Sequence, residues 1–427
     1  MLISFRLKNF CSFEEEQTLL MSANSQPDER ERYTFVTDTH KKERLLKTTA
    51  IYGANASGKT NFVGALYIMR EIVLESARNN SDTPLSFDPS IFKNNEPTEF
   101  EVTFIQENIK YQYGFAYCKE RILEEWLFAY PKGREQCWFQ RIYQEKSQKY
   151  EWKIGNNLKK GTLLQQATRD NALFLSIGDQ NNNSQLQKVY AWFSHKLKFM
   201  SMKGFDPEFS IEQCLEGKEE SKQRILQWLK SADIGIKDIK IKTVNTEKLK
   251  ESFEKEKEKD ALIKHFFEQF VNEKKEIKQA NFLHANENGQ QAFLPLGKES
   301  NGTQKLFAFL GPMMDSFEKG NILVVDEIDA GLHPLLCERI IDYFHSSFNA
   351  NNAQLIFNTH ATSLLRKNIF RKDQIWFCEK QYSATKLYPL SDFFIRKETR
   401  DIEKLYLEGR FGAIPYLDMI LEQFDGQ

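Results

Sequence analysis

The sequence predicts an α/β fold in which buried strands alternate with helices. An apolar run, Leu46–Tyr52, leads through a glycine loop into a stretch with helical spacing. Two further apolar runs, Ile322–Val325 and Leu355–Phe357, flank an expected helix, Pro334–Phe344. Continuous apolar runs of this length are typical of strands in a parallel sheet, whose carboxyl ends form the ligand-binding edge.

The composition is that of a globular protein with no dominant charge. Its 427 residues, 41% of them hydrophobic, suffice for several lobes and a sizeable core. Lys+Arg 59 and Asp+Glu 60 leave a formal charge of -1, so no global field favours nucleic acid or an anionic membrane. No cysteine pair has C-x-x-C spacing, which favours buried thiols in a reducing compartment. The six cysteines are Cys11, Cys118, Cys137, Cys214, Cys337 and Cys378.

The first residues predict a strand and not a targeting segment. Met1–Phe10 alternates apolar with polar or basic residues and has no long apolar centre. Because no run of about 18 apolar residues occurs, we expect no membrane span. We therefore expect a cytoplasmic protein.

The remaining elements follow from periodicity. Residues 1–20 predict a strand pair, and Asn61–Ser76 predicts a helix. Alternating runs over 97–154 predict an inserted antiparallel sheet, whereas 185–235 reads as mainly helical. Glutamates and lysines at helical spacing over 245–279 predict one or two exposed helices; a solvated face without a partner is the other interpretation.

The glycine loop matches G-x-x-x-x-G-K-[ST] at every fixed position, between a strand and a helix. Backbone N–H groups in such a loop point at the β-phosphate of a nucleotide. Lys59 is expected to reach the β- and γ-phosphates of ATP, and Thr60 to give its hydroxyl to Mg²⁺. The predicted nucleotide-binding residues are Gly53, Asn55, Ala56, Ser57, Gly58, Lys59 and Thr60.

Two later strands end in residues suited to hydrolysis. Asp326 is expected to hold Mg²⁺ through water, and Glu327 to orient or deprotonate the attacking water. Paired carboxylates at the end of a buried strand are costly without a cation, which favours a metal site. His360, at the end of the next strand, is expected to contact the γ-phosphate and the water.

A further anion site is predicted ahead of the acid pair. Ser300 is a good N-cap for an apolar helix that starts near Lys305. A serine and a glycine, Ser300 and Gly302, at a helix N-terminus can also grip a γ-phosphate held on another subunit.

In this order, the motifs resemble the Walker A, signature, Walker B and switch-histidine elements of ABC-type ATPases. The stretches FRLKNFCSF, ESNGTQKLF and DEIDAGLHP, with the tail DQIWFCEK…YLEGRFGAIP, are similar to bacterial AAA-labelled ATPases of phage-defence and abortive-infection systems, RloA- and AriA-like, which are relatives of OLD, RecF and SMC heads. The implied fold class is an α/β P-loop NTPase of ABC-ATPase head type, with an inserted antiparallel β region and a short charged helical insertion.

The resemblance also implies partners. It implies a homodimer, or a higher homo-oligomer of such dimers, in which Ser300 and Gly302 of one subunit close over ATP bound at Lys59 of the other. Asp329–His333 would lie at that interface. OLD relatives carry a C-terminal Toprim nuclease, but no convincing nuclease set follows His360, so a separately encoded Toprim-like nuclease or toxin is the expected effector. The glutamine that contacts Mg²⁺ in many ABC proteins is not assigned; Gln180 is a candidate.

Four segments are expected. Residues 1–96 form the N-terminal part of the nucleotide-binding core, and 97–180 an antiparallel β lobe. Residues 181–292 form a helical lobe with the charged insertion, and 293–427 complete the core.

We consider three hypotheses for the function. The leading hypothesis is an ATPase sensor and scaffold of an anti-phage system. The alternative is a RecF- or SMC-like repair ATPase that binds DNA through basic residues at Lys159–Lys160, at Lys196 and Lys198, and at Lys237–Lys242. A transporter subunit is the least favoured, because the inserted segments are large for one and no membrane association is expected.

Overall fold

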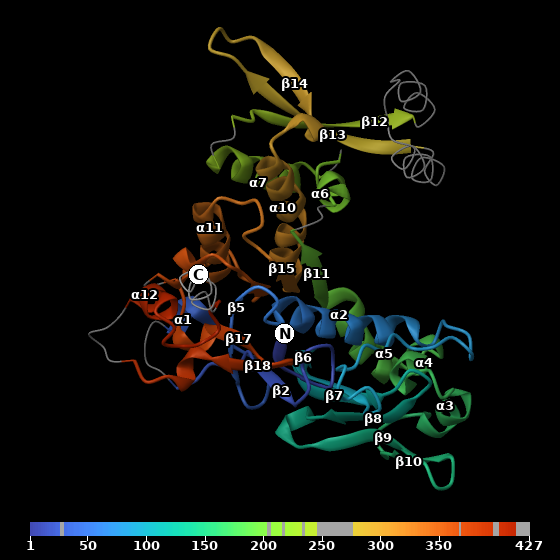
Figure 1. Ribbon diagram of the computed structural model, residues 1–427. Coiled ribbons are helices and arrows are strands. Elements are labelled where there is room, and N and C mark those ends of the chain that lie inside the picture. The colour runs from blue at the N-terminus through green and yellow to red at the C-terminus, as the bar shows by residue number, and fades with distance from the viewer. Residues whose placement is uncertain are drawn as a thin grey trace, which may run out of the picture. The chain divides into compact units, whose positions relative to one another are not determined.

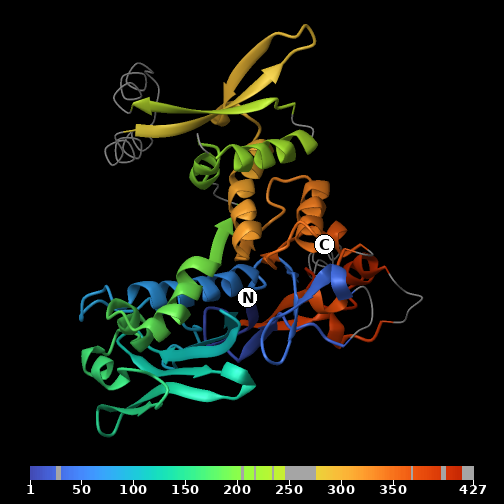
Figure 2. The same ribbon diagram turned by 180° about the vertical axis from the view of Figure 1, so that it is seen from behind.

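The computed structural model describes residues 1–25, 30–202, 206–215, 218–232, 235–245, 276–366, 369–395 and 401–415 (Figures 1 and 2). The chain divides into two compact units. The first contains residues 1–201, 316–330 and the chain from 334 onward; the second contains 202–315 and 331–333. The predicted four-segment division stays a prediction.

A six-stranded, mainly parallel sheet forms the centre of the first unit. Its order is β11-β15-β16-β5-β17-β18, and only the last pairing is antiparallel. Every residue of β5, β15 and β16 is buried, as their continuous apolar sequences predict. The strands are β5 (Thr48–Tyr52), β11 (Leu197–Ser201), β15 (Ile322–Asp326), β16 (Gln354–Asn358), β17 (Ile375–Gln381) and β18 (Ala384–Pro389).

Two strands of this sheet, β11 and β18, were not predicted. β11 lies within the stretch read as helical, and it pairs in parallel with β15 so that Ser201 stands opposite Asp326. Its five residues LKFMS alternate poorly and follow helix α5 (Ser184–Ala191) closely. A short edge strand of this kind takes its structure from pairing and not from local pattern.

A seven-stranded antiparallel sheet is the second layer of the first unit. Its order is β10-β9-β8-β7-β6-β1-β2, so the inserted strands pair with the N-terminal strand pair through β1 and β6. The predicted antiparallel region is therefore confirmed, and it is continuous with residues 1–20. The strands are β1 (Leu2–Lys8), β2 (Gln17–Leu20), β6 (Thr98–Gln106), β7 (Ile109–Tyr117), β8 (Ile122–Ala129), β9 (Gln136–Gln144) and β10 (Lys149–Ile154). A separate ribbon joins β3 (Thr34–Val36) and β4 (Arg44–Leu46).

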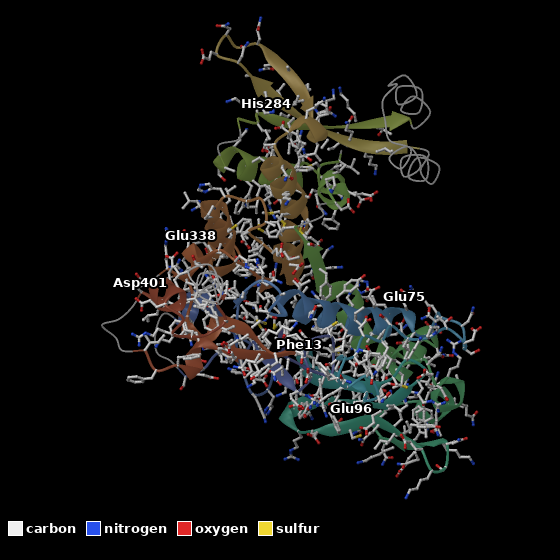
Figure 3. The ribbon with its side chains drawn as sticks, in the orientation of Figure 1. Phe13, Glu75, Glu96, His284, Glu338 and Asp401 are labelled. Atoms are coloured by element: carbon white, nitrogen blue, oxygen red, sulfur yellow. The ribbon has the colours of Figure 1, made fainter. Side chains whose placement is uncertain are left out.

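Helix α2 (Lys59–Glu75) joins the glycine loop to the core of the first unit. Its predicted apolar positions Phe62, Leu66, Met69 and Val73 are all buried. Phe62 packs edge-on against Phe5 and Phe13, at ring-centroid distances of 5.5 and 6.3 Å, and Phe13 is labelled in Figure 3. This packing ties the first turn of α2, and with it the glycine loop, to the antiparallel sheet. The other helices of the unit are α1 (Arg30–Tyr33), α3 (Gly161–Ala167), α4 (Phe174–Gln180), α5, α11 (Pro334–His345) and α12 (Ile402–Leu407).

A fully buried ion pair fastens α4 to the antiparallel sheet. The Arg141 and Glu125 side chains have no exposed surface and lie 2.9 Å apart. Glu125 also accepts the backbone N–H groups of Phe174 and Leu175, at 2.8 and 3.1 Å, and the Tyr113 hydroxyl at 3.0 Å. The carboxylate therefore accepts from the free donors at the start of α4 as well as from the Arg141 guanidinium.

The second unit contains a three-stranded antiparallel sheet of order β12-β13-β14. In its described residues, the strands are β12 (Asp238–Asn245), β13 (Glu276–Ala285) and β14 (Gln291–Pro295), and the α-helices are α6 (Glu208–Gln213), α7 (Glu219–Ser231) and most of α10 (Asn301–Lys319). Phe282 of β13 is buried and packs at 5.1 Å against Phe307 of α10. The stretch 181–292, predicted as a helical lobe, therefore contains strands as well as helices.

The charged insertion lies mostly outside the described residues. Asn245 and residues 276–279, at its predicted ends, belong to β12 and β13. The pattern Asp-Ile-Lys-Ile-Lys alternates with period two, which a strand with one covered face produces. Residues 246–275 are not described.

The six cysteines are unpaired thiols, and Cys214, Cys337 and Cys378 are buried. Among the helices of the described residues, none combines the length and the hydropathy that a membrane span requires.

Candidate functional site

The glycine loop runs from the end of β5 to the start of α2, as predicted. At Gly53 an added Cβ would stand 2.3 Å from the carbonyl oxygen of Cys378. At Gly58, where φ is 105°, it would stand 2.4 Å from Thr385 Oγ1. Both fixed glycines are therefore required by the close approach of neighbouring strands, and Gly58 also by its left-handed backbone.

Lys59 is folded into the curve of this loop. Its Nζ donates to the carbonyl oxygens of Gly53 and Ala54, at 2.7 and 2.9 Å. Burial lowers the pKa of Lys59 from its ordinary value, against the opposing influence of nearby acidic groups that include Glu327. A buried cation whose described hydrogen bonds go to neutral carbonyls is suited to receive an anion.

A hydroxyl network braces the loop from outside. Thr385 Oγ1 donates to the carbonyl oxygen of Ser57 at 2.8 Å and lies 2.8 Å from Ser12 Oγ. Asn61 Nδ2 donates to the same Ser12 hydroxyl at 2.9 Å. Strand β18, the turn after β1 and the first turn of α2 thus fix the loop together.

Asp326 is the last residue of β15 and Glu327 comes directly after it, beside the glycine loop. Thr60 Oγ1 donates to Asp326 Oδ1 at 3.1 Å, although the two residues are far apart in sequence. A hydroxyl and a carboxylate are hard oxygen donors, and Mg²⁺ is commonly held by one or two such protein groups together with substrate phosphates. The residues present therefore fit the predicted cation.

Asn358, which we did not predict as a site residue, contacts both acids. Its Nδ2 donates to Asp326 Oδ1 at 2.6 Å, and its Oδ1 accepts the backbone N–H of Glu327 at 2.5 Å. Glu327 has a left-handed backbone, with φ of 55°. The available signal was position, because Asn358 is the last residue of β16, two residues before His360.

His360 lies at the same edge of the sheet. Its backbone N–H donates to both carboxylate oxygens of Asp329 at 3.3 Å, and its side chain is exposed. Thr359 N donates to the Ile51 carbonyl at 3.1 Å, which ties this segment to the strand that carries the loop. The first unit thus brings together Lys59, Thr60, Asp326, Glu327 and His360 on adjacent strand ends.

Ser300 and Gly302 belong to the second unit and begin α10. Ser300 Oγ accepts the backbone N–H of Thr303 at 3.1 Å, which confirms the predicted N-cap. The helix begins at Asn301, earlier than the predicted start near Lys305. Gly302 lies close to Gly331, whose carbonyl oxygen would be 3.1 Å from an added Cβ.

Gln180 is not placed as a metal contact. It ends α4, which packs near the C-terminal end of α2 through Ser176 and Val73 (Oγ to carbonyl oxygen, 2.6 Å). A helix of 17 residues is roughly 25 Å long. Gln180 therefore lies far from Thr60, at the opposite end of α2. Ser201, at the end of β11, is the residue that the sheet aligns with Asp326.

A pocket of about 330 Å³ adjoins the glycine loop. Ala54–Ser57 form one wall, Cys378–Lys380 and Tyr382 another, and Ala413–Pro415 of the C-terminal tail a third. Glu379 Oε1 accepts the Ala413 N–H at 3.2 Å, and Phe411 stacks on Phe377 at 5.7 Å. The tail that carried part of the predicted resemblance is thus anchored beside the loop.

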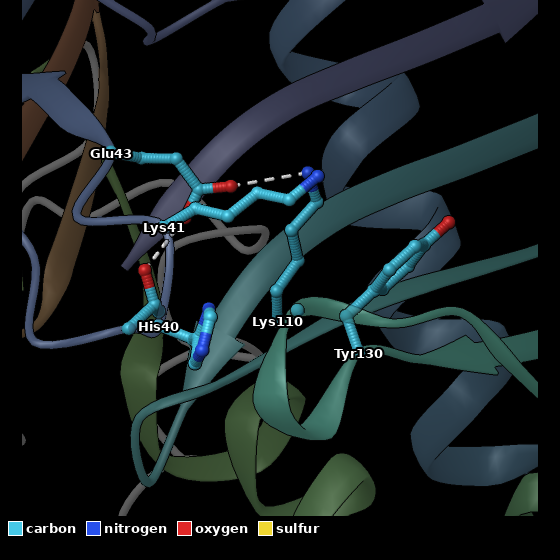
Figure 4. Close-up of a pocket in the computed structure, with 7 residues that line it drawn as sticks. His40, Lys41, Glu43, Lys110 and Tyr130 are labelled. Atoms are coloured by element: carbon cyan, nitrogen blue, oxygen red, sulfur yellow. Dashed lines mark hydrogen bonds and ion pairs between the residues drawn. The ribbon is translucent and has the colours of Figure 1, made fainter.

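A second hollow is too small for a ligand. It measures about 10 Å³ and lies beside the Lys110 side chain (Figure 4). Lys110 Nζ pairs with Glu43 Oε1 at 3.2 Å and stands 5.2 Å from the centre of the Tyr130 ring. Such a volume holds about one water molecule.

A comparison with family models decides the classification. Residues 48–366 match the model described as "AAA domain, putative AbiEii toxin, Type IV TA system". The chain belongs to this family. The AAA domain spans the loop, the signature segment, the acid pair and His360, so the chain is a P-loop ATPase by family and by geometry. The predicted α/β P-loop NTPase fold is confirmed.

Two solved SMC heads are similar to this chain at low sequence identity. The SMC head domain from Thermotoga maritima is 11% identical, with a TM-score of 0.38, and the match covers 91% of this chain and 98% of that one. An SMC head bound to the C-terminal winged-helix domain of ScpA is 13% identical, with a TM-score of 0.42 and coverage of 91% and 97%. No curated protein matches.

Proposed function

We propose that this chain binds and hydrolyses ATP in a Mg²⁺-dependent reaction, and that it dimerises around ATP as the sensor and scaffold of an anti-phage defence system. The observation that carries the enzymatic part is the junction of Thr60, Asp326 and Glu327 at the mouth of the glycine loop. The hydroxyl of Thr60 and a carboxylate oxygen of Asp326 lie 3.1 Å apart there.

Each residue has a role in this proposal. The loop N–H groups and Lys59 bind the phosphates, and Thr60 with Asp326 would hold the cation. Bound Mg²⁺ would neutralise charge that develops on the phosphate oxygens. Glu327 accepts the proton of the attacking water, and the His360 side chain orients the water and the terminal phosphate.

The dimeric part of the proposal rests on α10. Ser300 and Asn301 are exposed at the start of a 19-residue helix, whose N-terminal N–H groups favour an anion. Ser300 and Gly302 of one subunit would grip ATP held at Lys59 of another, with Asp329–His333 at the interface. A second copy would thus complete each site.

The defence role is supported by the family, whose description names a toxin and a toxin–antitoxin system. The proposed effector is a separately encoded Toprim-like nuclease or toxin, and the proposed location is the cytoplasm. Two measurements test the proposal: Mg²⁺-dependent release of phosphate from ATP by the purified chain, and the proteins that co-purify with it. No phosphate release would exclude the enzymatic part, and a pure protein without an effector gene beside its own would exclude the defence part.

DNA binding is the second candidate, and one surface favours it. Lys240 and Lys242 are exposed on the same side of β12, and Lys242 Nζ stands 6.0 Å from the ring centre of the exposed Phe293. Of the other predicted contributors, Lys196 and Lys198 bond to backbone carbonyls of Lys319 and Ser194. DNA binding that weakens steeply between 50 and 200 mM salt (about 10³-fold or more for six phosphate contacts) would support this function.

A further inference from the structure

Asn358 makes three hydrogen bonds to the strand end that carries both acids. Its side chain is fully buried at the last position of β16. The amide donates to Asp326 and accepts from Glu327, as described above. Its own carbonyl oxygen accepts the backbone N–H of Ile328 at 3.2 Å. One residue therefore contacts three consecutive positions, 326 to 328.

The bond to Glu327 fixes an unfavourable backbone conformation. A non-glycine residue at positive φ costs about 1 kcal/mol or more and persists when its surroundings hold it. At Glu327 the N–H to Asn358 Oδ1 bond of 2.5 Å does so. The direction in which the Glu327 side chain leaves the main chain depends on this bond.

The bond to Asp326 fixes the rotation of its carboxylate. Oδ1 accepts from both Thr60 Oγ1 and Asn358 Nδ2, at 3.1 and 2.6 Å. The Thr60 hydroxyl keeps its lone pairs available while it donates. Two donors from different elements thus hold Oδ1 of the carboxylate beside Thr60.

We propose that Asn358 is a positioning residue for ATP hydrolysis, which sets the orientation of Asp326 and Glu327 through these two bonds. The inference rests on the proposed hydrolytic function. Residues that orient metal-binding groups in this way typically account for 10- to 100-fold in metal affinity or activity.

The chain offers a matched control in Asn349. This asparagine is also buried, and its side chain makes three bonds where that of Asn358 makes two: to the carbonyls of Phe344 and Ala353, at 2.9 and 2.8 Å, and from the Ala353 N–H at 2.7 Å. It precedes β16, at the end of the strand remote from the acids. Asn349 therefore fixes local backbone, as Asn358 does, but it does not contact the candidate ATP site.

The experiment compares Asn358→Ala, Asn358→Thr and Asn349→Ala in the full chain. Three quantities are measured: kcat for ATP, the Mg²⁺ concentration that half-saturates binding of a fluorescent ATP analogue, and the Kd of that analogue in EDTA. For Asn358→Ala we expect kcat to fall and the Mg²⁺ requirement to rise by roughly 10- to 100-fold, with the EDTA Kd unchanged. Asn358→Thr, whose hydroxyl replaces one of the two bonds, should be intermediate. Asn349→Ala should match the unmodified chain in all three quantities, even if its melting temperature falls.

Other outcomes overturn the inference. If Asn358→Ala and Asn349→Ala have equal kcat, Asn358 has no special role. If Asn358→Ala loses binding in EDTA to the same extent as kcat, it acts through folding. If the alanine variant does not fold, an unchanged kcat in Asn358→Thr decides against positioning. Failure of the unmodified chain to hydrolyse ATP would instead refute the proposed function, and this inference with it.

Discussion

At the residue scale, the nucleotide loop depends on Lys59. Its ammonium group bonds only loop carbonyls among the hydrogen bonds described for it, and a phosphate would replace neutral acceptors with charged ones. A hydrogen bond to a charged partner contributes about 1.5–3 kcal/mol. Lys59→Ala should therefore weaken ATP binding by roughly 10- to 150-fold, as measured by isothermal titration. Lys386→Ala removes an exposed lysine of β18 and should leave the affinity unchanged; an equal loss in both variants would contradict the assignment.

Site residues differ in how far sequence alone could reveal them. Gly53–Thr60, Asp326–Glu327 and His360 stand at fixed offsets from apolar strands, so their convergence followed from strand-end geometry. Asn358 also stands at a strand end, but its importance comes from the pairing of β15 with β16, which the sequence does not show. Gln180 failed as a metal candidate because a position after a short apolar run does not reveal which end of α2 the run contacts.

At the element scale, the buried carboxylate of Glu125 on β8 joins the antiparallel sheet to helix α4. Removing Glu125 would leave Arg141 buried without its charge partner and two N–H groups of α4 unsatisfied. Breaking such a pair costs about 3–5 kcal/mol. Glu125→Ala should lower the free energy of unfolding by that amount in urea denaturation. The exposed Glu151 on β10 is the control, and Glu151→Ala should change it by less than about 0.5 kcal/mol. Comparable effects of the two substitutions would refute this account.

Helix α11 ends in a histidine that gives the first unit a pH-dependent stability. His345 Nε2 lies 2.8 Å from Thr48 Oγ1, and burial, with Lys47 and Arg32 nearby, lowers the pKa of His345 to about 3. The unfolded state takes up a proton near pH 6.5 whereas the folded state does not. The contribution of neutral His345 to the free energy of unfolding is therefore complete above pH 6.5. Below pH 6.5 this free energy falls by about 1.4 kcal/mol per pH unit, down to pH 3.

Denaturation at pH 7 and pH 5 measures this decline. His345 should account for about 2 kcal/mol of the difference between the two pH values. His345→Gln should remove that share, and His40→Gln, at an exposed position, should keep it. An unchanged difference in His345→Gln would show that other groups cause the loss.

The strands predicted best are those that are buried on both faces of the sheet. β5, β15 and β16 have continuous apolar sequences, and the apolar positions of α2 recur at helical spacing, so pattern and structure agree. β12 and β13 carry lysines and glutamines between their apolar residues. These polar residues hid the alternation of apolar and polar positions that indicates a strand. β11 depends on its partner β15 for its identity as a strand.

At the scale of the whole molecule, the proposed ATP dimer makes each site depend on two copies. Gly302→Asp would place a negative charge at the start of α10, where a phosphate is expected. A chain with this substitution should bind ATP normally and yet stay monomeric in light scattering with ATP. Its melting temperature must be compared as well, because Gly302 lies against Gly331. An ATP-dependent dimer of the folded variant would contradict the role of the signature segment.

A mixture of two inactive variants also tests whether each ATP site needs residues from two copies. Lys59→Ala lacks phosphate binding and Gly302→Asp lacks the signature, so a mixed dimer retains one competent site. An equimolar mixture should recover part of the unmodified turnover, at most about half, because one of the two sites of a mixed dimer is complete. No recovery, with exchange between dimers demonstrated, would indicate that each chain forms its site alone.

The most direct test of the account is the turnover of Glu327→Gln. The substitution preserves the shape of the side chain and removes its ability to accept a proton. General-base catalysis contributes about 10²- to 10⁴-fold. We predict a fall in kcat of at least about 100-fold, with Mg²⁺–ATP affinity retained and an ATP-bound dimer that persists in light scattering. Turnover equal to that of the unmodified chain would contradict the assignment of Glu327 and, with it, the hydrolytic mechanism proposed for this site.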